Sequence, residues 1–164
     1  MRLRYRHVFI FVLVLVTTTA LSVLPAHGAD NVLPSEMMAV IQTDFQGFNT
    51  NDFALSNSQY VSDVVIIDET PPYRWEGPGA NTRYWADFRK FAKTIKLTSY
   101  HLSFQKPAYW EETNGRAYVV LPTIFTGVAG GKPFTETGVE TYLLIKVGAT
   151  WKTQGWAYGK TSMH

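Results

Sequence analysis

Apolar residues recur at helical spacing in two stretches of the chain. The stripe that follows Ser35, a potential helix N-cap, consists of Met37, Ile41, Phe45 and Phe48. The stripe that follows Asn81, a second potential cap, consists of Tyr84, Phe88, Phe91 and Ile95. Between them, the polar segment 49–52 can end the first helix and cap a short one at residues 53–55. The pattern therefore predicts three helices.

Other stretches have the pattern of strands. Residues 60–68 contain a buried-type run of Val and Ile, and Pro71-Pro72 follows it. After Lys96, four segments alternate and are rich in Thr, Val, Tyr and Trp: Leu97–Trp110, Arg116–Gly127, Pro133–Val147 and Trp151–Thr161. Asn114-Gly115, Gly130-Gly131 and Gly148-Ala149 predict the turns between them. We predict an α+β fold in which a curved, mostly antiparallel sheet wraps around three N-terminal helices.

The first thirty residues have a different pattern. Three arginines within the first six residues precede the uncharged apolar run 8–16. Ala26 and Gly28 fit the small residues that signal peptidase prefers three and one positions before its cut, and a cut after Ala29 is the alternative. The pattern is typical of a secretory signal peptide.

We predict a signal peptide at residues 1–29 and one domain at residues 30–164, located in the periplasm or secreted. An uncleaved membrane anchor is the alternative, because the apolar run extended to Leu24 approaches the ~20 residues of a membrane span. After cleavage we expect no membrane association.

Charge and cysteine content exclude several function classes. The net charge of +2 depends on the three arginines of the predicted signal, so the remaining chain is slightly acidic. It has no cluster of Lys and Arg, and we expect no nucleic-acid partner. The absence of cysteine excludes disulfides, a thiolate nucleophile and Cys-containing zinc sites. No phosphate-binding glycine motif and no His-rich metal site is present, so the sequence predicts neither a cofactor nor a metal.

Two segments carry a family resemblance. In Val65–Pro78, a strand ends at Asp68 and is followed by a Pro-containing turn and Trp75-Glu76-Gly77, with Trp85 in the next helix. Trp151–Tyr158 has the character of a final strand. With the order of elements, these segments make the chain resemble the nuclear transport factor 2-like superfamily, specifically its SnoaL-like bacterial branch. The resemblance implies a central pocket.

The resemblance implies two functions. One is the binding of a small apolar or aromatic molecule; the other is an isomerase, dehydratase or hydrolase that uses a pocket carboxylate for acid/base chemistry. The scaffold hosts both catalytic and non-catalytic proteins, so the fold alone does not choose. We predict a homodimer through the outer face of the sheet, because outward-facing aromatic and β-branched residues would otherwise leave a large exposed apolar patch.

Two residues are candidates for catalysis. Burial of Asp68 in an apolar pocket would raise its pKa toward working pH, as acid/base catalysis requires. The alternative is a strand-end Asp that accepts hydrogen bonds from the turn. His101 is the other candidate, but it alternates with Tyr100 and Leu102, so it faces solvent or a subunit if those residues face the core.

Aromatic residues are the candidates for ligand binding. Their flat rings suit a pocket wall, and the predicted set is Trp75, Trp85, Tyr84, Tyr118 and Tyr142. Trp75 and Trp85 lead, because the loop and helix that carry them cover the pocket mouth in the resembled fold. Glu136 and Glu140 share a strand face with Tyr142. A Glu beside a Tyr could act as an acid/base pair, but a solvated face with cross-strand pairs is the favoured interpretation.

Overall fold

The computed structural model describes residues 32–164, so the predicted signal peptide lies outside the described residues. It contains the three predicted helices, α1 (Ser35–Thr50), α2 (Phe53–Asn57) and α3 (Ala80–Thr94). The Asp52 carboxylate caps α2 by accepting a hydrogen bond from the Leu55 N–H at 3.0 Å. The predicted caps of the other two helices are wrong: α1 begins after Pro34 without a side-chain cap, and α3 begins after Gly79.

Within residues 32–164, seven strands form one sheet: β1 (Tyr60–Ile67), β2 (Arg74–Trp75), β3 (Leu97–Phe104), β4 (Tyr109–Thr113), β5 (Arg116–Ala129), β6 (Lys132–Val147) and β7 (Thr150–Met163). Their order is β2-β1-β7-β6-β5-β3, and β4 also pairs with β5. All pairings are antiparallel except that of β1 with β7. The predicted α+β architecture is confirmed.

The strand predicted at 97–110 is two strands. β3 pairs with the distal part of β5, from Thr123 onward, and β4 pairs with its first part, from Arg116 to Val120. Pro107 in the connection has no N–H to donate to a ladder. The Gln105 and Ala108 N–H groups keep the connection on β5 through the carbonyls of Pro122 and Val120, both at 2.9 Å. The strand beside β5 is thus divided into β3 and β4, while the connection between them stays hydrogen-bonded to β5.

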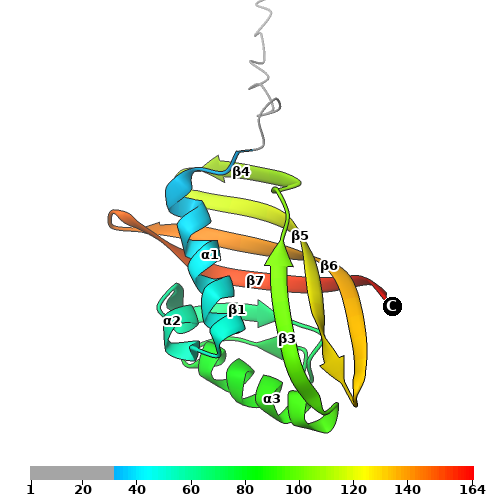
Figure 1. Cartoon of the computed structure of the whole chain (residues 1–164). Coiled ribbons are helices and arrows are strands. Elements are labelled where there is room, and N and C mark those ends of the chain that lie inside the picture. The colour runs from blue at the N-terminus through cyan, green and yellow to red at the C-terminus, as the bar shows by residue number, and fades with distance from the viewer. Residues whose placement is uncertain (1–31) are drawn as a thin grey trace, which may run out of the picture.

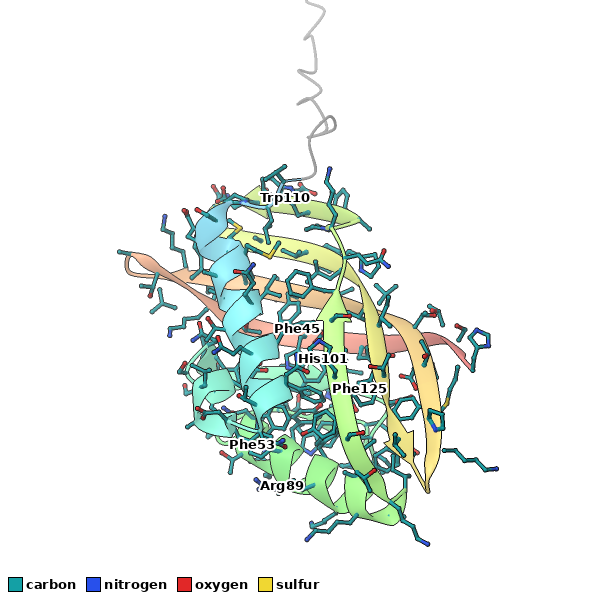
Figure 2. All side chains as sticks on the ribbon, viewed as in Figure 1. Phe45, Phe53, Arg89, His101, Trp110 and Phe125 are labelled. Atoms are coloured by element: carbon teal, nitrogen blue, oxygen red, sulfur yellow. The ribbon has the colours of Figure 1, made fainter. Side chains whose placement is uncertain are left out.

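The helices lie on one side of the curved sheet, with α1 across it and α3 along its lower end (Figure 1). The space between them is packed with apolar side chains, of which Ile41, Val64, Ile66, Val119, Leu121 and Leu144 are among the most deeply buried. The Arg89 guanidinium lies 4.9 Å from the centre of the Phe53 ring, which ties α3 to α2 (Figure 2). Within residues 32–164, no helix is long and apolar enough to cross a membrane.

A register shift between β6 and β7 changes which β7 residues face the helices. Leu144 pairs with Thr153, but Tyr142 pairs with Trp156, so β7 carries one extra residue between these pairs. Thr153 and Trp156 are therefore both buried, although strict alternation would place them on opposite faces. The shift brings Trp156 and Tyr158 to the inner face of the sheet.

Candidate functional site

A cavity of about 70 Å³ lies between α1, α3 and the inner face of the sheet. Its wall is mostly aromatic, and the ring-bearing residues other than tyrosine are Phe45, Phe48, Trp85, Phe88, Phe91, Phe125 and Trp156. The labelled Phe45 and Phe125 lie in the region between α1 and β3–β5 where these rings gather (Figure 2). The polar wall consists of Asp44, Asp68, Glu69, Thr70, Glu136, Glu140 and the tyrosines 60, 84, 142 and 158.

Four residues of the polar wall and the neighbouring Ser56 form a buried network that we call the inner cluster. The four wall residues are Asp44, Tyr60, Glu140 and Tyr142. The Asp44 carboxylate accepts hydrogen bonds from the hydroxyls of Ser56 (2.5 Å), Tyr60 (2.7 Å) and Tyr142 (2.9 Å). The Tyr142 hydroxyl also lies 3.0 Å from Glu140 Oε1. All five residues are almost fully buried, so water does not compete for these contacts.

Close approach of α2 to α1 makes the inner cluster possible. A Cβ atom on Gly47 would lie 2.6 Å from the Ser56 nitrogen, closer than real Cβ contacts. Glycine at this position therefore lets α2 pack against α1 and brings the Ser56 hydroxyl to Asp44. Tyr60 on β1 and Tyr142 on β6 contact the same Asp44 carboxylate from the sheet.

The proton count of the inner cluster distinguishes its two carboxyl groups. Tyr142 has a single hydroxyl proton, and Asp44 and Glu140 both lie within hydrogen-bond distance of that hydroxyl. A second proton is needed to make both contacts favourable, so one carboxyl is protonated. Asp44 has two further donors and Glu140 has none, which stabilises charge on Asp44. We infer that Glu140 is the neutral acid and Asp44 the carboxylate.

The pKa shifts agree with this assignment. Burial raises the pKa of Glu140 well above its usual range, and the neighbouring Asp44 charge raises it further. Burial also raises the pKa of Asp44, but its hydrogen bonds from Ser56, Tyr60 and Tyr142 oppose the rise. Burial and the Asp44 charge raise the pKa values of Tyr60 and Tyr142, so both remain hydroxyl donors.

Four residues form what we call the outer cluster: Glu69, Glu136 and Tyr158 of the cavity wall, and Lys160, which contacts the two glutamates. The Lys160 ammonium lies 2.6 Å from Glu69 and 2.9 Å from Glu136, and the Tyr158 hydroxyl donates to Glu136 at 2.5 Å. Glu136 is only 2% exposed, whereas the Lys160 side chain is 36% exposed. The outer cluster therefore holds a buried carboxylate beside a partly hydrated ammonium.

Gly138 permits the outer cluster. It faces the cavity side of β6 between Glu136 and Glu140, and a Cβ atom there would lie 2.3 Å from the Tyr158 ring. The ring of Tyr158 therefore lies over the backbone of β6, where a side chain would otherwise be. This position lets its hydroxyl reach diagonally to Glu136.

Asp68 lies on the cavity wall immediately after β1. Its Oδ1 accepts a hydrogen bond from the Thr70 N–H at 2.6 Å, and the Tyr84 hydroxyl lies 3.5 Å from its Oδ2. Burial raises the pKa of Asp68, while the contacts with Thr70 and Tyr84 oppose the rise. Asp68 is thus both the turn cap and a partly buried carboxyl of the cavity wall, which the sequence presented as alternatives.

The predicted ligand-binding residues divide into two groups. Tyr84, Trp85 and Tyr142 line the cavity, and the Trp85 indole is fixed by a hydrogen bond to Asn57 at 3.1 Å. Trp75 does not line it: its indole N–H donates to Asp87 at 3.0 Å and its ring packs edge-on against Tyr84. Trp75 therefore supports the wall from behind.

Two other predictions need correction. Tyr118 is 46% exposed on the outer face of the sheet, beside Tyr109, because its position on β5 points away from the helices. The solvated face predicted for Glu136, Glu140 and Tyr142 is wrong, since all three are at most 5% exposed. His101 is exposed on β3 and does not line the cavity, as the alternation with Tyr100 and Leu102 indicated.

Asp44 and Tyr60 line the cavity but are not among the site residues that the sequence predicts. Asp44 lies four residues after Val40 and seven after Met37, so it falls on the apolar stripe of α1. A single charged residue on an apolar helix stripe could have indicated a buried polar site, because burying a charge costs free energy unless it has a partner. Tyr60 gave no comparable signal, since aromatic residues are common at strand starts.

No protein-family model and no curated protein sequence matches this chain. Solved structures do match. A nuclear transport factor 2-like superfamily protein from Salmonella enterica serovar Typhimurium has a TM-score of 0.64 at 16% identity, covering 77% of this chain and 89% of that one. The fold is that of the nuclear transport factor 2-like proteins.

Two named neighbours share this nuclear transport factor 2-like fold. A hexachlorocyclohexane dehydrochlorinase from Novosphingobium barchaimii has a TM-score of 0.66 at 11% identity, with 79% of this chain and 86% of that one covered. A ketosteroid isomerase-like protein from Erwinia carotovora has a TM-score of 0.61 at 17% identity, with 77% and 95% covered. At these identities the likeness establishes the fold, and function follows from the residues of the cavity. Assignment to the SnoaL-like branch stays a prediction.

Proposed function

We propose that the cavity binds a small, largely apolar or aromatic molecule. The observation that carries the proposal is a wall of aromatic rings that contains two buried polar atoms without a partner among the described residues. These atoms are Glu140 Oε2 and Trp156 Nε1. Buried groups of this kind cost free energy when unpaired, so a ligand that pairs with them gains affinity.

Neighbours with the same fold support a small-molecule function. One bears the name of a hexachlorocyclohexane dehydrochlorinase and another is described as ketosteroid isomerase-like. Both names refer to small organic molecules with a ring skeleton.

Binding can be tested with three single-ring compounds: benzylamine, benzyl alcohol and benzoate. We expect saturable binding of at least one by calorimetry, with quenching of tryptophan fluorescence. Trp85→Ala should weaken it by about 1–3 kcal/mol, the usual range for losing a buried aromatic contact. Trp110→Ala, on β4 outside the cavity wall, is the matched control. Absence of saturable binding for all three compounds would contradict the proposal.

A second function, proton transfer on the bound molecule, is favoured by the inner cluster. Glu140 is the group suited to give a proton, since burial and the Asp44 charge keep it protonated. Asp68 is suited to accept one once it is ionised, and burial raises its pKa toward neutrality. This pair would serve an isomerase, a dehydratase or a hydrolase.

The proton-transfer proposal is tested with isosteric amides. On a substrate found by screening, Asp68→Asn and Glu140→Gln should each lose turnover even at saturating substrate, because an amide keeps the shape but does not exchange the proton. If Asp68 only caps its turn, Asp68→Asn will lower the melting temperature and leave turnover intact. That result would remove Asp68 from the mechanism.

We also propose that the protein is exported and that residues 1–29 are removed. The support is the arginine-rich start, the short apolar run and the small residues before Asp30. N-terminal sequencing of the protein from the periplasm or medium should begin at Ala29 or Asp30. An intact Met1 in that fraction would contradict cleavage.

A homodimer through the outer face of the sheet is a further proposal. Tyr118 and Leu143 are neighbours across β5 and β6 and are 46% and 38% exposed. Covering such a patch removes apolar surface from water. Sedimentation at micromolar concentration should show a dimer, and Leu143→Lys should shift it to monomer. A wild-type protein that sediments only as monomer would contradict the proposal.

A further inference from the structure

The charge of the cavity wall is strongly one-sided. Five carboxyl groups line it, on Asp44, Asp68, Glu69, Glu136 and Glu140. Among the described lining residues there is no Lys, Arg or His. One ammonium, that of Lys160, contacts two of the five, and the other three form no ion pair with a cationic side chain within residues 32–164. A ligand in this cavity therefore enters a field that favours positive charge.

The apolar part of the wall has the same preference. The rings of Phe48, Trp85 and Phe88 pack together with centroids 5.3 to 6.0 Å apart, and Tyr84 packs against Trp85 and Trp156. The faces of aromatic rings carry negative charge density, so they attract cations as well as apolar groups. This set of rings therefore suits a molecule that has both a cationic group and an apolar part.

Glu140 offers a specific acceptor. Its Oε1 is in contact with Tyr142, but its Oε2 is buried and has no partner in the described part of the chain. The hydroxyls of Ser56, Tyr60 and Tyr142 all lie within hydrogen-bond distance of Asp44, and the contact of Tyr142 with Glu140 is to Oε1 and not to Oε2. A donor for Glu140 Oε2 must therefore come from a bound molecule or from water. Trp156 Nε1, the unpaired donor of the wall, is neutral and does not offset the carboxyl charge.

We propose that the molecule bound in this cavity is an organic cation, with an ammonium group that donates to Glu140 Oε2 and an apolar part that lies among the rings of the wall. This inference rests on the small-molecule binding proposed above and specifies its chemical class. A protonated amine supplies charge and N–H donors together. An alcohol of the same shape supplies a donor without charge, and a carboxylate adds another negative group.

Binding of a cation has a consequence for pH. Glu140 faces Asp44 and Tyr142, with Tyr60 and Tyr84 on neighbouring elements and Asp68 further along the wall. The pKa values of Glu140, Asp44 and Asp68 are raised by burial, and a nearby positive charge lowers them again. The cation therefore binds with release of protons, and its affinity rises as pH rises.

The first test compares benzylamine, benzyl alcohol and benzoate by calorimetry at pH 8 and pH 5. We expect benzylamine to bind at least about tenfold more tightly than the alcohol at pH 8, the scale of a charge-assisted hydrogen bond. Its advantage should shrink at pH 5, and benzoate should bind most weakly. If the alcohol or benzoate binds as tightly as the amine, the cation inference fails while small-molecule binding stands. If none of the three binds, both proposals fail.

The second test removes one carboxyl group. Glu140→Gln should weaken benzylamine about tenfold and change benzyl alcohol by less than about threefold, since Gln keeps the shape but cannot ionise when the cation binds. Retained alcohol binding also shows that the variant is folded. Asp68→Asn should act in the same direction, and it takes over the test if Glu140→Gln does not fold. Glu111→Gln, on exposed β4, is the control. Equal losses for amine and alcohol would overturn the inference.

Discussion

The inner and outer clusters each bury a glutamate side chain, but they stabilise it in different ways. Glu140 and Glu136 lie on the same face of β6, four residues apart, and both are almost fully buried. Each contacts a tyrosine hydroxyl, Tyr142 for Glu140 and Tyr158 for Glu136. The third neighbour differs: a second carboxyl, Asp44, lies beyond Tyr142, whereas the Lys160 ammonium contacts Glu136.

This difference determines the charge state of each glutamate. Beside Lys160, Glu136 is a carboxylate in an ion pair. Beside Asp44, Glu140 keeps its proton, because burial raises its pKa well above the usual range and the nearby Asp44 charge raises it further. The neighbours on adjacent elements therefore decide the chemistry of a residue, and one strand face carries both an acid and a carboxylate.

The largest expected effect is that of Tyr142→Phe, which removes the hydroxyl that joins the two carboxyls of the inner cluster. Asp44 loses a donor and Glu140 loses its only partner. We expect a loss of about 2–3 kcal/mol in the free energy of unfolding, measured by urea denaturation. Tyr118→Phe, on the exposed outer face, should change it by less than about 0.5 kcal/mol. Equal effects of the two variants would mean that the inner cluster adds no stability.

A smaller effect is expected for Lys160→Met, which removes the counter-charge of the outer cluster. Glu136 is buried, but solvent partly screens the Lys160 side chain, so we expect a loss of about 1 kcal/mol. The difference from wild type should decrease near ~1 M salt, which screens exposed charges. A loss larger than that of Tyr142→Phe would reverse the ranking of the two clusters.

The smallest expected effect separates the two glutamates by its sign. In the folded protein Glu140 keeps its proton at pH values where the unfolded chain, with a pKa near ~4.3, has lost it. The contribution of Glu140 to stability is therefore complete at pH values below its unfolded pKa, and it is lost as pH rises through the raised pKa of the folded protein. Gln has no proton to lose, so Glu140→Gln should raise the melting temperature by about 2 °C at pH 8 and change it little at pH 4.

Glu136→Gln is the matched control, because it should lower the melting temperature at pH 8 by breaking the contact with Lys160. Differential scanning calorimetry across this pH range measures both variants. Shifts of the same sign for the two variants would contradict the charge states assigned above.

The sequence predicted the fold better than the site. Helical stripes and Gly-containing turns are local signals, and they placed the three helices and the hairpins of β4–β7 correctly. The polar face of β6 was misassigned because Glu136, Glu140 and Tyr142 have the alternation of a solvated surface. Burial of that face depends on α1 and α3, which are far away in sequence and cover it only in the folded chain.

The pairing register of β7 with β6 was the other feature that the sequence did not predict. The extra residue of β7 between Thr153 and Trp156 reverses the alternation. Gly155 in that segment is a residue type that often marks a bulge, but it does not show where the register shifts before the pairing with β6 is known. Asp44 was accessible in principle, as a charge on an apolar helix stripe. Its partners on α2, β1 and β6 were not, because three separate elements supply them.

The parallel pairing of β1 with β7 has a kinetic consequence. β1 carries Tyr60 and β7 carries Trp156 and Tyr158, so the two strands must meet before the cavity wall is complete. Their partnership spans most of the described chain, and contacts of such large sequence separation form late and slowly. A chain that has not yet acquired β7 therefore has no finished cavity. Ligand binding in a refolding experiment should accordingly report the last step of sheet assembly and lag behind the formation of α1 and α3.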